Sequence, residues 1–418
     1  MNEQIKKRIS AINIGIIPDG YKKTKVGIVP AEWEIKTLAE LCEISAGGDI
    51  EKEHCQTTPN EKFKFPVYSN ALTNKGLYGY SDIFKISEKT VTVTGRGEIG
   101  YAIARNEKYY PIVRLLVLKP KNENINTVFL AHQINESKIY IESTGVPQLT
   151  APQLSLLKIF CPSLKEQIII AEILSTQDKL IELYERKIEQ LKTLKKGYLQ
   201  KMFPKKGCKY PELRFKGFTD PWEQRKLGAV LSLLKDGTHG THKNSDEGVF
   251  LLSAKNIKNG EVYIDENADR RISKQEFDSI HSNFRLQEND VLLTIVGSIG
   301  EVSILKNPDI MTFQRSVAFL RPKDGLLSTF LKTEIESYDF QKELSDRKSQ
   351  SAQPGVYLGE LEKIPFNLPN VEEQQQIGSY FSNLDRLITL HQHKLDKEKQ
   401  KKKALMQLLL TGKVRVST

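Results

Sequence analysis

Two long stretches of the chain, residues 166–203 and 373–410, alternate apolar and charged residues with the spacing of a helix that has one apolar face. Apolar residues recur at the a and d positions of a heptad repeat over about four heptads, which is typical of a coiled coil. In the first stretch they fill six of eight such positions, namely Ile173, Leu180, Tyr184, Leu191, Leu194 and Tyr198. In the second stretch the comparable stripe is interrupted by His391 and Glu398 and contains Phe381, Leu384, Ile388, Leu395, Leu405 and Leu409.

Prolines bound the predicted helices. Pro162 and Pro369 lie shortly before them and Pro204 ends the first, as expected for a residue that helix interiors exclude. At 1.5 Å per residue, a helix of about 38 residues spans roughly 57 Å. A helix of this length needs a partner for its apolar stripe. The simplest partner is the other predicted helix, packed antiparallel; the alternative is two independent helices, each packed on its own domain.

The two stretches belong to an internal repeat, and such a repeat decides the architecture. An offset of 207 residues aligns Glu166 with Glu373, and the same register extends over about 60 positions. Nearer the N-terminus, Trp33 aligns with Trp222 at an offset of 189 residues. These are the only two tryptophans, and we interpret them as core anchors at the heads of the two copies. The chain is therefore predicted to be a duplication in which each copy ends in a long helix.

Between each head and its helix, alternating runs bounded by turn residues predict short β-strands. They occupy Lys89–Thr94, Ile112–Leu118, Val249–Ser253 and Asp290–Val296. The offset grows from 189 to 207 residues across this region, so the second copy is 18 residues longer there. We therefore predict an α/β (α+β) fold with two duplicated mixed domains whose frames are alike and whose middle regions differ. That combination indicates two related surfaces that read different targets.

Composition and charge fit a soluble protein that binds a polyanion. The 418 residues suffice for two or three domains. The formal net charge is +10, and a basic balance favours nucleic acid through neutralisation of phosphates and release of counterions. The four cysteines form no CxxC pair, residues 1–10 are polar and basic without the apolar core of a signal peptide, and no apolar run is long enough to span a membrane. We therefore expect a cytoplasmic protein without disulfides or membrane spans.

Two motifs resemble ligand sites but fit simpler interpretations. Gly95-x-Gly97-x-x-Gly100 matches the dinucleotide fingerprint, yet residues 101–104 alternate like a strand instead of opening a helix. We predict a glycine hairpin there. Residues 236–242 hold two histidines three residues apart, but the spacing supplies no further ligands for a metal. We interpret this segment as a polar loop whose donors reach phosphates or bases.

Catalytic motifs are missing from the sequence. No GxxxxGK[ST] phosphate loop indicates a motor, and no Asn/Asp-Pro-Pro-aromatic motif indicates adenine methylation. Pro308-Asp309 with Asp346 and Lys348 fits a nuclease motif only loosely, and His54 is no better supported as a metal ligand. The chain is therefore predicted to read a target rather than to catalyse a reaction.

Taken in order, these features resemble the specificity (S) subunit of type I restriction-modification systems over essentially the whole chain. The resemblance rests on the two tryptophans and their flanks, on the Pro-x-x-x-Glu-Gln start of both helices, and on residues 93–100, 145–149, 209–227, 236–241 and 294–300. Their order, the duplication and the paired long helices together make the resemblance specific. One departure is His242, where proline is expected.

The resemblance implies two target-recognition domains, each reading one half of a bipartite, asymmetric DNA site. The two helices would pack as an antiparallel coiled coil with pseudo-two-fold symmetry, separate the domains and fix the unread spacer between the half-sites. On this basis the chain divides into an N-terminal arm (1–20), a first recognition domain (21–163), a first long helix (164–203), a linker (204–214), a second recognition domain (215–370) and a second long helix (371–412).

The resemblance also implies partner subunits. Two modification subunits, which bind S-adenosylmethionine and methylate adenine, would dock on the helices, and restriction subunits, which cleave with ATP and Mg²⁺, would join them. This chain would bind no cofactor or metal and carry no catalytic residue. The coiled coil and its docking surface would be formed by Ile173, Leu180, Tyr184, Leu191, Leu194, Phe381, Leu384, Ile388 and Leu395.

Polar residues in turns and at strand ends of the two predicted domains are candidate DNA contacts. In the first domain they are Tyr68, Asn70, Asn74, Lys75 and Arg96, and in the second Thr238, His239, Lys255, Asn256 and Arg315. Two other functions remain open: an assembly scaffold that reads no DNA, and a stand-alone enzyme. Salt-dependent DNA binding and methyl transfer by the isolated chain would distinguish the three.

Overall fold

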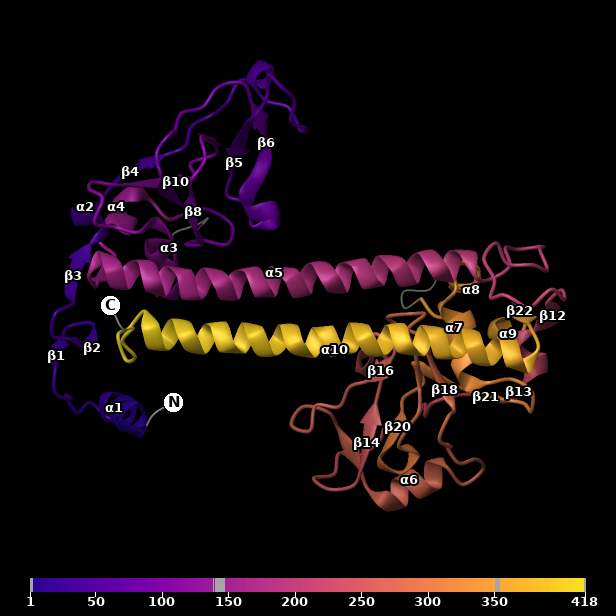
Figure 1. The fold of residues 1–418 in the computed structure, drawn as a ribbon. Helices are drawn as coiled ribbons and strands as arrows, with labels where there is room; N and C mark the ends of the chain where they lie inside the picture. Colours follow the sequence, from indigo (N-terminus) through magenta and orange to yellow (C-terminus); the bar gives the residue numbers. More distant parts are fainter. Residues whose placement is uncertain (1–2, 138, 140–146, 350–353, 417–418) are drawn as a thin grey trace. The chain divides into compact units, whose positions relative to one another are not determined.

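The computed structural model describes residues 3–137, 139, 147–349 and 354–416. The chain forms two compact units, Met1–Leu183 together with Lys394–Thr418, and Tyr184–His393. Figure 1 traces the course of the chain. The first unit thus combines two pieces that are distant in sequence. No helix among the described residues combines the length and apolarity needed to cross a membrane.

The first unit contains a four-stranded antiparallel sheet and a three-stranded sheet. Its strands are β1 (Tyr21–Thr24), β2 (Gly27–Pro30), β3 (Glu34–Thr37), β4 (Cys42–Ala46), β5 (Phe65–Tyr68), β6 (Leu77–Ser81), β7 (Thr90–Val93), β8 (Ala102–Arg105), β9 (Tyr110–Pro111), β10 (Leu116–Pro120) and β11 (Lys158–Cys161). Its short helices are α1 (Glu3–Asn13), α2 (Leu38–Leu41), α3 (Thr127–Glu136) and α4 (Ala151–Ser155). The four-stranded sheet has the order β4-β10-β7-β8, and the other has the order β6-β5-β9. Buried residues of the first sheet and of α3, among them Val91, Leu118 and Ile134, form the core between them.

The second unit repeats these layers. Its strands are β12 (Glu223–Lys226), β13 (Leu231–Asp236), β14 (Val249–Leu252), β15 (Ile257–Lys258), β16 (Glu261–Val262), β17 (Arg271–Ile272), β18 (Val291–Thr294), β19 (Val302–Ile304), β20 (Met311–Phe313), β21 (Val317–Pro322) and β22 (Pro365–Leu368). Its short helices are α6 (Lys274–Ile280), α7 (Ser328–Glu336), α8 (Tyr338–Asp346) and α9 (Leu358–Leu361). The four-stranded sheet has the order β13-β21-β18-β19, and the three-stranded sheet has the order β17-β14-β20.

The strand orders of the two units correspond one to one, which confirms the predicted duplication and the mixed α/β fold. Each three-stranded sheet also contains one parallel pair, β5 with β9 and β14 with β20. The predicted glycine hairpin joins β7 to β8, where the Gly100 N–H donates to the Thr94 carbonyl at 2.8 Å. In the second unit the Gly300 N–H donates to the Thr294 carbonyl at 3.0 Å. The predicted two-fold relation between the units stays a prediction.

Three of the four predicted strands coincide with β7, β14 and β18, and the fourth is only half right. The strand expected over Ile112–Leu118 begins at Leu116, as β10. Val113 and Arg114 have φ angles of 53° and 58°, and this left-handed conformation ends a β-strand. The apolar run therefore contains a turn that its periodicity does not reveal.

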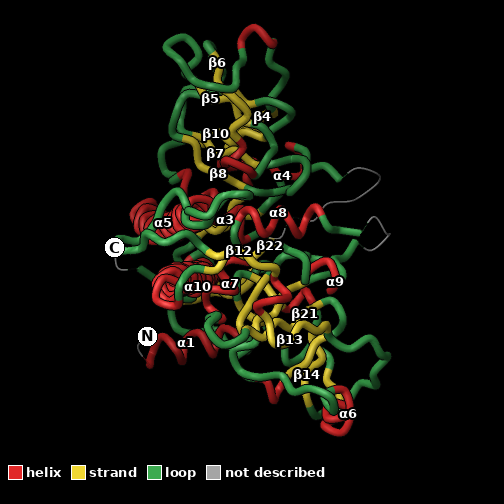
Figure 2. The backbone as a smooth tube through the Cα atoms, turned by 90° about the vertical axis from the view of Figure 1, so that its right-hand side faces the viewer, coloured by secondary structure: helices red, strands yellow, loops and turns green. Residues whose placement is uncertain are grey.

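The two long helices are α5 (Leu164–Lys201) and α10 (Val371–Leu409). Figure 1 shows them from the side and Figure 2 nearly end-on. An ion pair of the same kind joins them in each unit: Lys402 Nζ lies 2.5 Å from Asp178 Oδ1, and Lys195 Nζ lies 2.6 Å from Asp385 Oδ1. The start of α5 thus pairs with the end of α10 and the reverse, so the helices are antiparallel, as predicted.

The buried stripe of α5 agrees with the predicted heptad at alternate positions. At the positions between them, the buried residue comes one residue later than predicted. Its members follow a spacing of four and three residues: Ile170, Leu174, Gln177, Ile181, Ile188 and Leu191. Ile173, Leu180 and Tyr184 are half-buried. Leu194 is wrong as a residue of the seam between the helices, because it is 43% exposed. In α10, by contrast, Phe381, Leu384 and Leu395 are buried and Ile388 is half-buried.

Each long helix begins with a buried glutamate that binds a tryptophan and an arginine. In the first unit Trp33 Nε1–H donates to Glu166 at 3.0 Å, and Arg415 donates two hydrogen bonds of 2.7 and 2.9 Å to the same carboxylate. We call this arrangement the carboxylate clasp. The second unit repeats it with Trp222, Glu373 and Arg214. Both tryptophans are 1% exposed, which confirms their interpretation as core anchors.

Candidate nucleic-acid interface

In the first unit a buried arginine holds two candidate DNA contacts beside each other. The Arg105 guanidinium lies 3.6 Å from the centre of the Tyr68 ring and donates to the Lys75 carbonyl at 2.6 Å. The Tyr68 hydroxyl, at the end of β5, donates to Glu107 at 2.7 Å. Burial raises the pKa of Tyr68 above its ordinary value, so its hydroxyl keeps its proton at neutral pH. Arg105 was not among the sequence candidates, and it positions both residues.

Asn74 and Lys75 form an exposed turn before β6. Their φ angles are 50° and 54°, a left-handed conformation that asparagine tolerates better than most residues. Lys75 Nζ lies 2.6 Å from a Glu182 oxygen on α5, and both side chains are exposed. Exchanging such a surface ion pair for a phosphate costs little, since exposed pairs contribute about 1 kcal/mol or less.

Asn70 and Arg96 meet at the glycine hairpin. Asn70 accepts from the Gly95 N–H at 2.7 Å and donates to the Val113 carbonyl at 2.5 Å. Its amide therefore ties the hairpin to the turn before β10. Arg96 is exposed and donates to Gln148 at 3.1 Å. Of this pair, Arg96 has the side chain that can leave its partner for a base or phosphate at low cost.

In the second unit the loop after β13 brings three candidates together. Thr238 Oγ1 lies 2.6 Å from His242 Nε2, and exposed His239 Nε2 lies 2.6 Å from Asp236 Oδ2. The Arg315 backbone N–H donates to the Thr238 carbonyl at 3.0 Å. The Arg315 side chain is exposed. Polar and basic side chains thus gather at this edge of the four-stranded sheet.

Lys255 and Asn256 lie side by side in sequence but differ in exposure. Lys255 is exposed and pairs with Asp269 at 2.8 Å. Asn256 is wrong as a DNA contact: it is 5% exposed and donates to the Tyr263 carbonyl at 3.0 Å and to Asp269 at 2.7 Å. It also accepts from the Ser253 N–H at 3.0 Å. Serine three residues before a polar side chain is a capping signal, and this signal could have predicted its structural role.

His242, at the end of the second-unit loop, and Glu276, behind it, were not among the residues that the sequence analysis named as DNA contacts. His242 Nδ1 lies 2.7 Å from Glu276 Oε1 on α6, and Arg270 donates to the His242 carbonyl at 2.6 Å. Together they brace the loop that holds Thr238. The signal that could have found His242 is its position where proline was expected. Nothing in the local sequence indicates Glu276, because α6 reaches the loop only through the fold.

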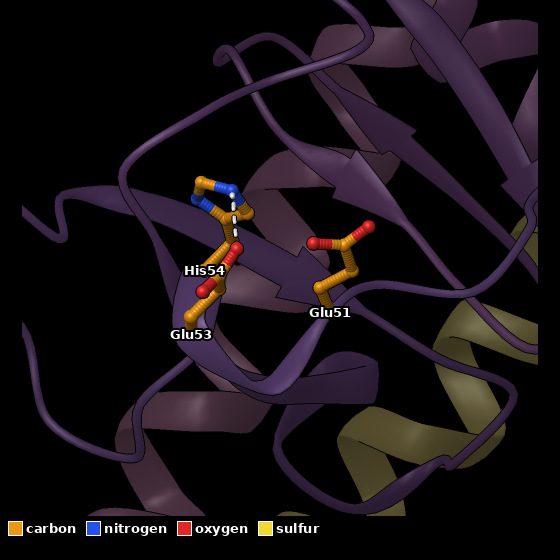
Figure 3. Close-up of side chains that lie close together, drawn as sticks. All are labelled: Glu51, Glu53 and His54. Atoms are coloured by element: carbon orange, nitrogen blue, oxygen red, sulfur yellow. Dashed lines mark ion pairs between the residues drawn. The ribbon is translucent and has the colours of Figure 1, made fainter.

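Among the described residues, one group of side chains has metal-ligand atoms close together. Figure 3 shows Glu51, Glu53 and His54, whose ligand atoms lie within 4.8 Å of one another. His54 Nδ1 lies 2.8 Å from Asp82, and this hydrogen bond raises the pKa of the imidazole. The exposed carboxylates fit ion pairing with this histidine, so we assign no metal to the group.

The family follows from a match to most of the chain. The profile described as "Type I restriction modification DNA specificity domain" matches residues 30–193 and again residues 219–399. Each match begins just before one of the two buried tryptophans and ends within a long helix. The chain belongs to the type I restriction-modification specificity family. The two matches correspond to the two copies of the duplication.

Members of the specificity family resemble this chain over different shares of its length. The type I restriction enzyme MjaVIII specificity subunit of Methanocaldococcus jannaschii is 25% identical and spans 93% of this chain and 94% of its own. The EcoBI specificity subunit of Escherichia coli is 26% identical over 56% of this chain and 53% of its own. The crystal structure of the S subunit from M. genitalium has a TM-score of 0.60 at 17% identity and covers 92% of this chain and 97% of its own. It shares the fold described above.

Proposed function

We propose that this chain is the DNA sequence-specificity subunit of a type I restriction-modification complex, and that its two units bind the two halves of a bipartite, asymmetric site. The observation that carries the proposal is a common frame with different side chains at the same edge of each sheet. In the first unit the Val113 N–H donates to the Gly48 carbonyl at 3.0 Å, and in the second the Arg315 N–H donates to the Thr238 carbonyl at 3.0 Å. Rigid frames with variable loops are the usual basis of changed recognition.

The side chains at these edges suit DNA. Exposed cations such as Lys75, Arg96 and Arg315 would contact phosphates or guanine edges, while Thr238 and His239 offer hydrogen bonds to bases. The net charge of +10 supports attraction to the duplex. Half-sites read from one face of DNA lie about 34 Å apart. A helix pair of roughly 57 Å is long enough to hold two reading units at that spacing.

Exposed leucines on the long helices support docking of partner subunits. Leu183 and Leu390, which the offset of 207 residues relates, are 54% and 46% exposed, and Leu194 and Leu387 are 43% and 39% exposed. Apolar groups exposed on a helix favour a protein partner. We propose that two modification subunits, carrying S-adenosylmethionine, dock here and that restriction subunits using ATP and Mg²⁺ join them. This chain then selects the DNA site and holds the complex together, and its partner subunits carry out methylation and cleavage.

The reading function is tested by mapping modified adenines across the host genome with and without the gene for this chain. We expect one split motif, two short half-sites around a fixed gap, to lose its modification when the gene is removed and to regain it on complementation. If the modification subunit is expressed and no motif depends on the gene, the chain is a scaffold that reads nothing.

Docking is tested by replacing Leu183 and Leu390 with aspartate. We expect the double variant to lose the modification subunits in co-purification, because each carboxylate would be buried against an apolar surface. Leu156→Asp is the control, since Leu156 is 73% exposed and lies just after α4, outside the long helices. Equal recovery of partners by both variants would show that the leucines are not the docking surface.

A further inference from the structure

The geometry points to Thr238 as a specificity-determining residue whose hydroxyl accepts, and does not donate, a hydrogen bond from a DNA base. The base that donates this hydrogen bond would be an adenine or a cytosine, whose amino group is a donor in the major groove. The inference rests on the proposed function and deepens it. It assigns a hydrogen-bond polarity, and hence a class of base, to one position of the half-site that the second unit reads.

Three side chains set this polarity. Glu276 Oε1 lies 2.7 Å from His242 Nδ1, and His242 Nε2 lies 2.6 Å from Thr238 Oγ1. They come from three places in the second unit: Glu276 from the first turn of α6, His242 from the far end of the loop, and Thr238 from the start of the loop after β13. His242 and Glu276 have side chains 10% and 28% exposed. Thr238 is half-buried as well, so part of it remains accessible to a ligand.

The order of protons follows from what each group can do. An ionised carboxylate only accepts, so His242 Nδ1 carries the proton that it donates to Glu276. In a neutral imidazole Nε2 is then the acceptor. The Thr238 hydroxyl proton points to Nε2, and its oxygen keeps lone pairs only. One of them faces the Gly240 N–H at 3.4 Å, which leaves one acceptor position for a ligand.

The surroundings hold this arrangement in place. Arg270 donates to the His242 carbonyl and to the Asn244 side chain, both at 2.6 Å. The Thr238 backbone is bonded on both sides, its N–H to the Phe313 carbonyl at 2.9 Å and its carbonyl to the Arg315 N–H at 3.0 Å. A hydroxyl with a free rotor serves donors and acceptors equally, whereas one locked by its neighbours discriminates between them. The lock is what makes Thr238 selective.

The test is selection of duplexes from a library with randomised half-sites by the full chain in complex with its modification subunits. Thr238→Val removes the hydroxyl at nearly constant volume, and we expect the preference for an amino-bearing base at one position to fall about five- to tenfold. Thr238→Ser keeps the hydroxyl and its polarity, so the preference should remain. The half-site read by the first unit is an internal control for folding and should not change.

A second variant tests the polarity itself. In Glu276→Lys an ammonium replaces the carboxylate and can only donate to Nδ1. Nε2 then carries the ring proton and donates to the Thr238 oxygen, so the Thr238 O–H is free to donate to a base. We expect the preferred base at that position to change to one with a keto group, thymine or guanine. Asp278→Lys makes the same change of charge on the same helix, at an exposed residue, and should leave the base preference as it was.

The outcomes separate the two levels of the proposal. A wild-type complex that selects no sequence refutes the proposed function, and this inference with it. A selective wild-type complex whose preference is unchanged in Thr238→Val, or lost equally in Thr238→Ser, overturns the inference alone. If Thr238→Val loses selection at both half-sites, it has failed to fold, and Glu276→Lys decides: unchanged preference overturns the inference, and a change to a keto base supports it.

Discussion

At the scale of single residues, the carboxylate clasps are the points where the chain depends on distant charges. Glu166 is fully buried, and its partner Arg415 is separated from it by 249 residues. The hydrogen bonds with Glu166 raise the pKa of the Arg415 guanidinium. A buried carboxylate left without its cation is strongly destabilising. The stability of the first unit therefore depends on Arg415, which lies after α10.

Arg415→Gln should lower the free energy of unfolding by about 2–4 kcal/mol, below the largest effects of lost buried ion pairs because Arg415 is partly exposed. Urea unfolding measures this loss. Lys413→Gln is the matched control, because the hydrogen bond of 2.8 Å from half-buried Lys413 to Asn13 lies on the surface. Adding Glu166→Gln to Arg415→Gln should restore part of the stability. If Arg415→Gln and Lys413→Gln are equally stable, the clasp contributes little to the free energy of unfolding.

Glu334 of α7 predicts a dependence of stability on pH. It is 2% exposed, Oε2 has no hydrogen-bond partner among the described residues, and burial raises its pKa from 4.5 to about 8. Between these pH values the folded chain keeps the proton and the unfolded chain releases it. The free energy of unfolding therefore falls as pH rises through this window, by up to about 1.4 kcal/mol per pH unit.

Glu334→Gln should remove this loss, and the equivalent residue of α3 is already glutamine, Gln133. We expect the variant and the wild type to be similarly stable near pH 5, and the variant to be more stable at pH 8. Urea unfolding at both pH values tests this. Glu372→Gln, at an exposed position in the first turn of α10, should unfold as the wild type does. Identical pH profiles for the three proteins would contradict the burial argument.

The role of a residue was predictable where a sequence pattern indicates its contacts. It was not predictable where the contact arises only because the fold brings distant segments together. The paired tryptophans indicated core anchors, because their alignment placed them at equivalent heads of the two copies. Asn256 was misassigned because a polar residue in a turn serves capping and ligand binding equally well. Glu276 gave no signal, since its contact with His242 joins elements separated by 34 residues.

At the scale of elements, the two long helices show both the strength and the limit of periodicity. The heptad positions predicted for α5 differ by one residue from the buried ones, because neighbouring positions such as Ile173 and Leu174 are both apolar. The duplication resolves the ambiguity: subtracting 207 from Phe381, Ile388 and Leu395 gives Leu174, Ile181 and Ile188, the positions that are buried. Comparison of the copies therefore carries more information than either helix alone.

Leu174 and Leu194 provide a direct test of the observed seam. Leu174 is 0% exposed and Leu194 is 43% exposed. Leu174→Ala should cost about 2–5 kcal/mol of unfolding free energy, whereas Leu194→Ala should cost less than about 0.5 kcal/mol. Chemical denaturation of the isolated chain measures both. The opposite ranking would restore the seam predicted from the sequence.

At the scale of the whole molecule, the helix pair is expected to set the length of the unread DNA spacer. The Asp178–Lys402 and Asp385–Lys195 pairs lie on either side of the midpoint of the helices. One heptad inserted between residues 178 and 195 of α5, and one between residues 385 and 402 of α10, leaves both pairs in register. Seven residues add roughly 10 Å.

We expect the accepted spacer to lengthen and both half-sites to stay unchanged when modified adenines are mapped with this variant. An insertion in α5 alone is the control, since it breaks the register of one ion pair and should abolish modification. If the double insertion changes the half-sites and leaves the spacer as it was, the helices do not act as a ruler.

The organisation of the whole chain was largely predictable because it is written twice in the sequence. Strand order was not, since the pairing of β4 with β10 and of β13 with β21 joins segments with no local signal. The composition of the first unit was also hidden. Its core includes Leu409 and Leu410 together with Ile170 and Leu174, and no repeat announces that these distant residues meet.

That composition has a consequence for how the protein is made. Residues 1–183 emerge from the ribosome first, yet the core that they share with Leu409 and Leu410 cannot form until α10 has been synthesised. The second unit is continuous from Tyr184 to His393, so all of its parts have emerged earlier. Domains that fold during synthesis usually do so from the N-terminus onwards. Here the unit whose synthesis begins first is completed last, so the apolar residues that pack against Leu409 and Leu410 lack these partners while the second unit is being synthesised.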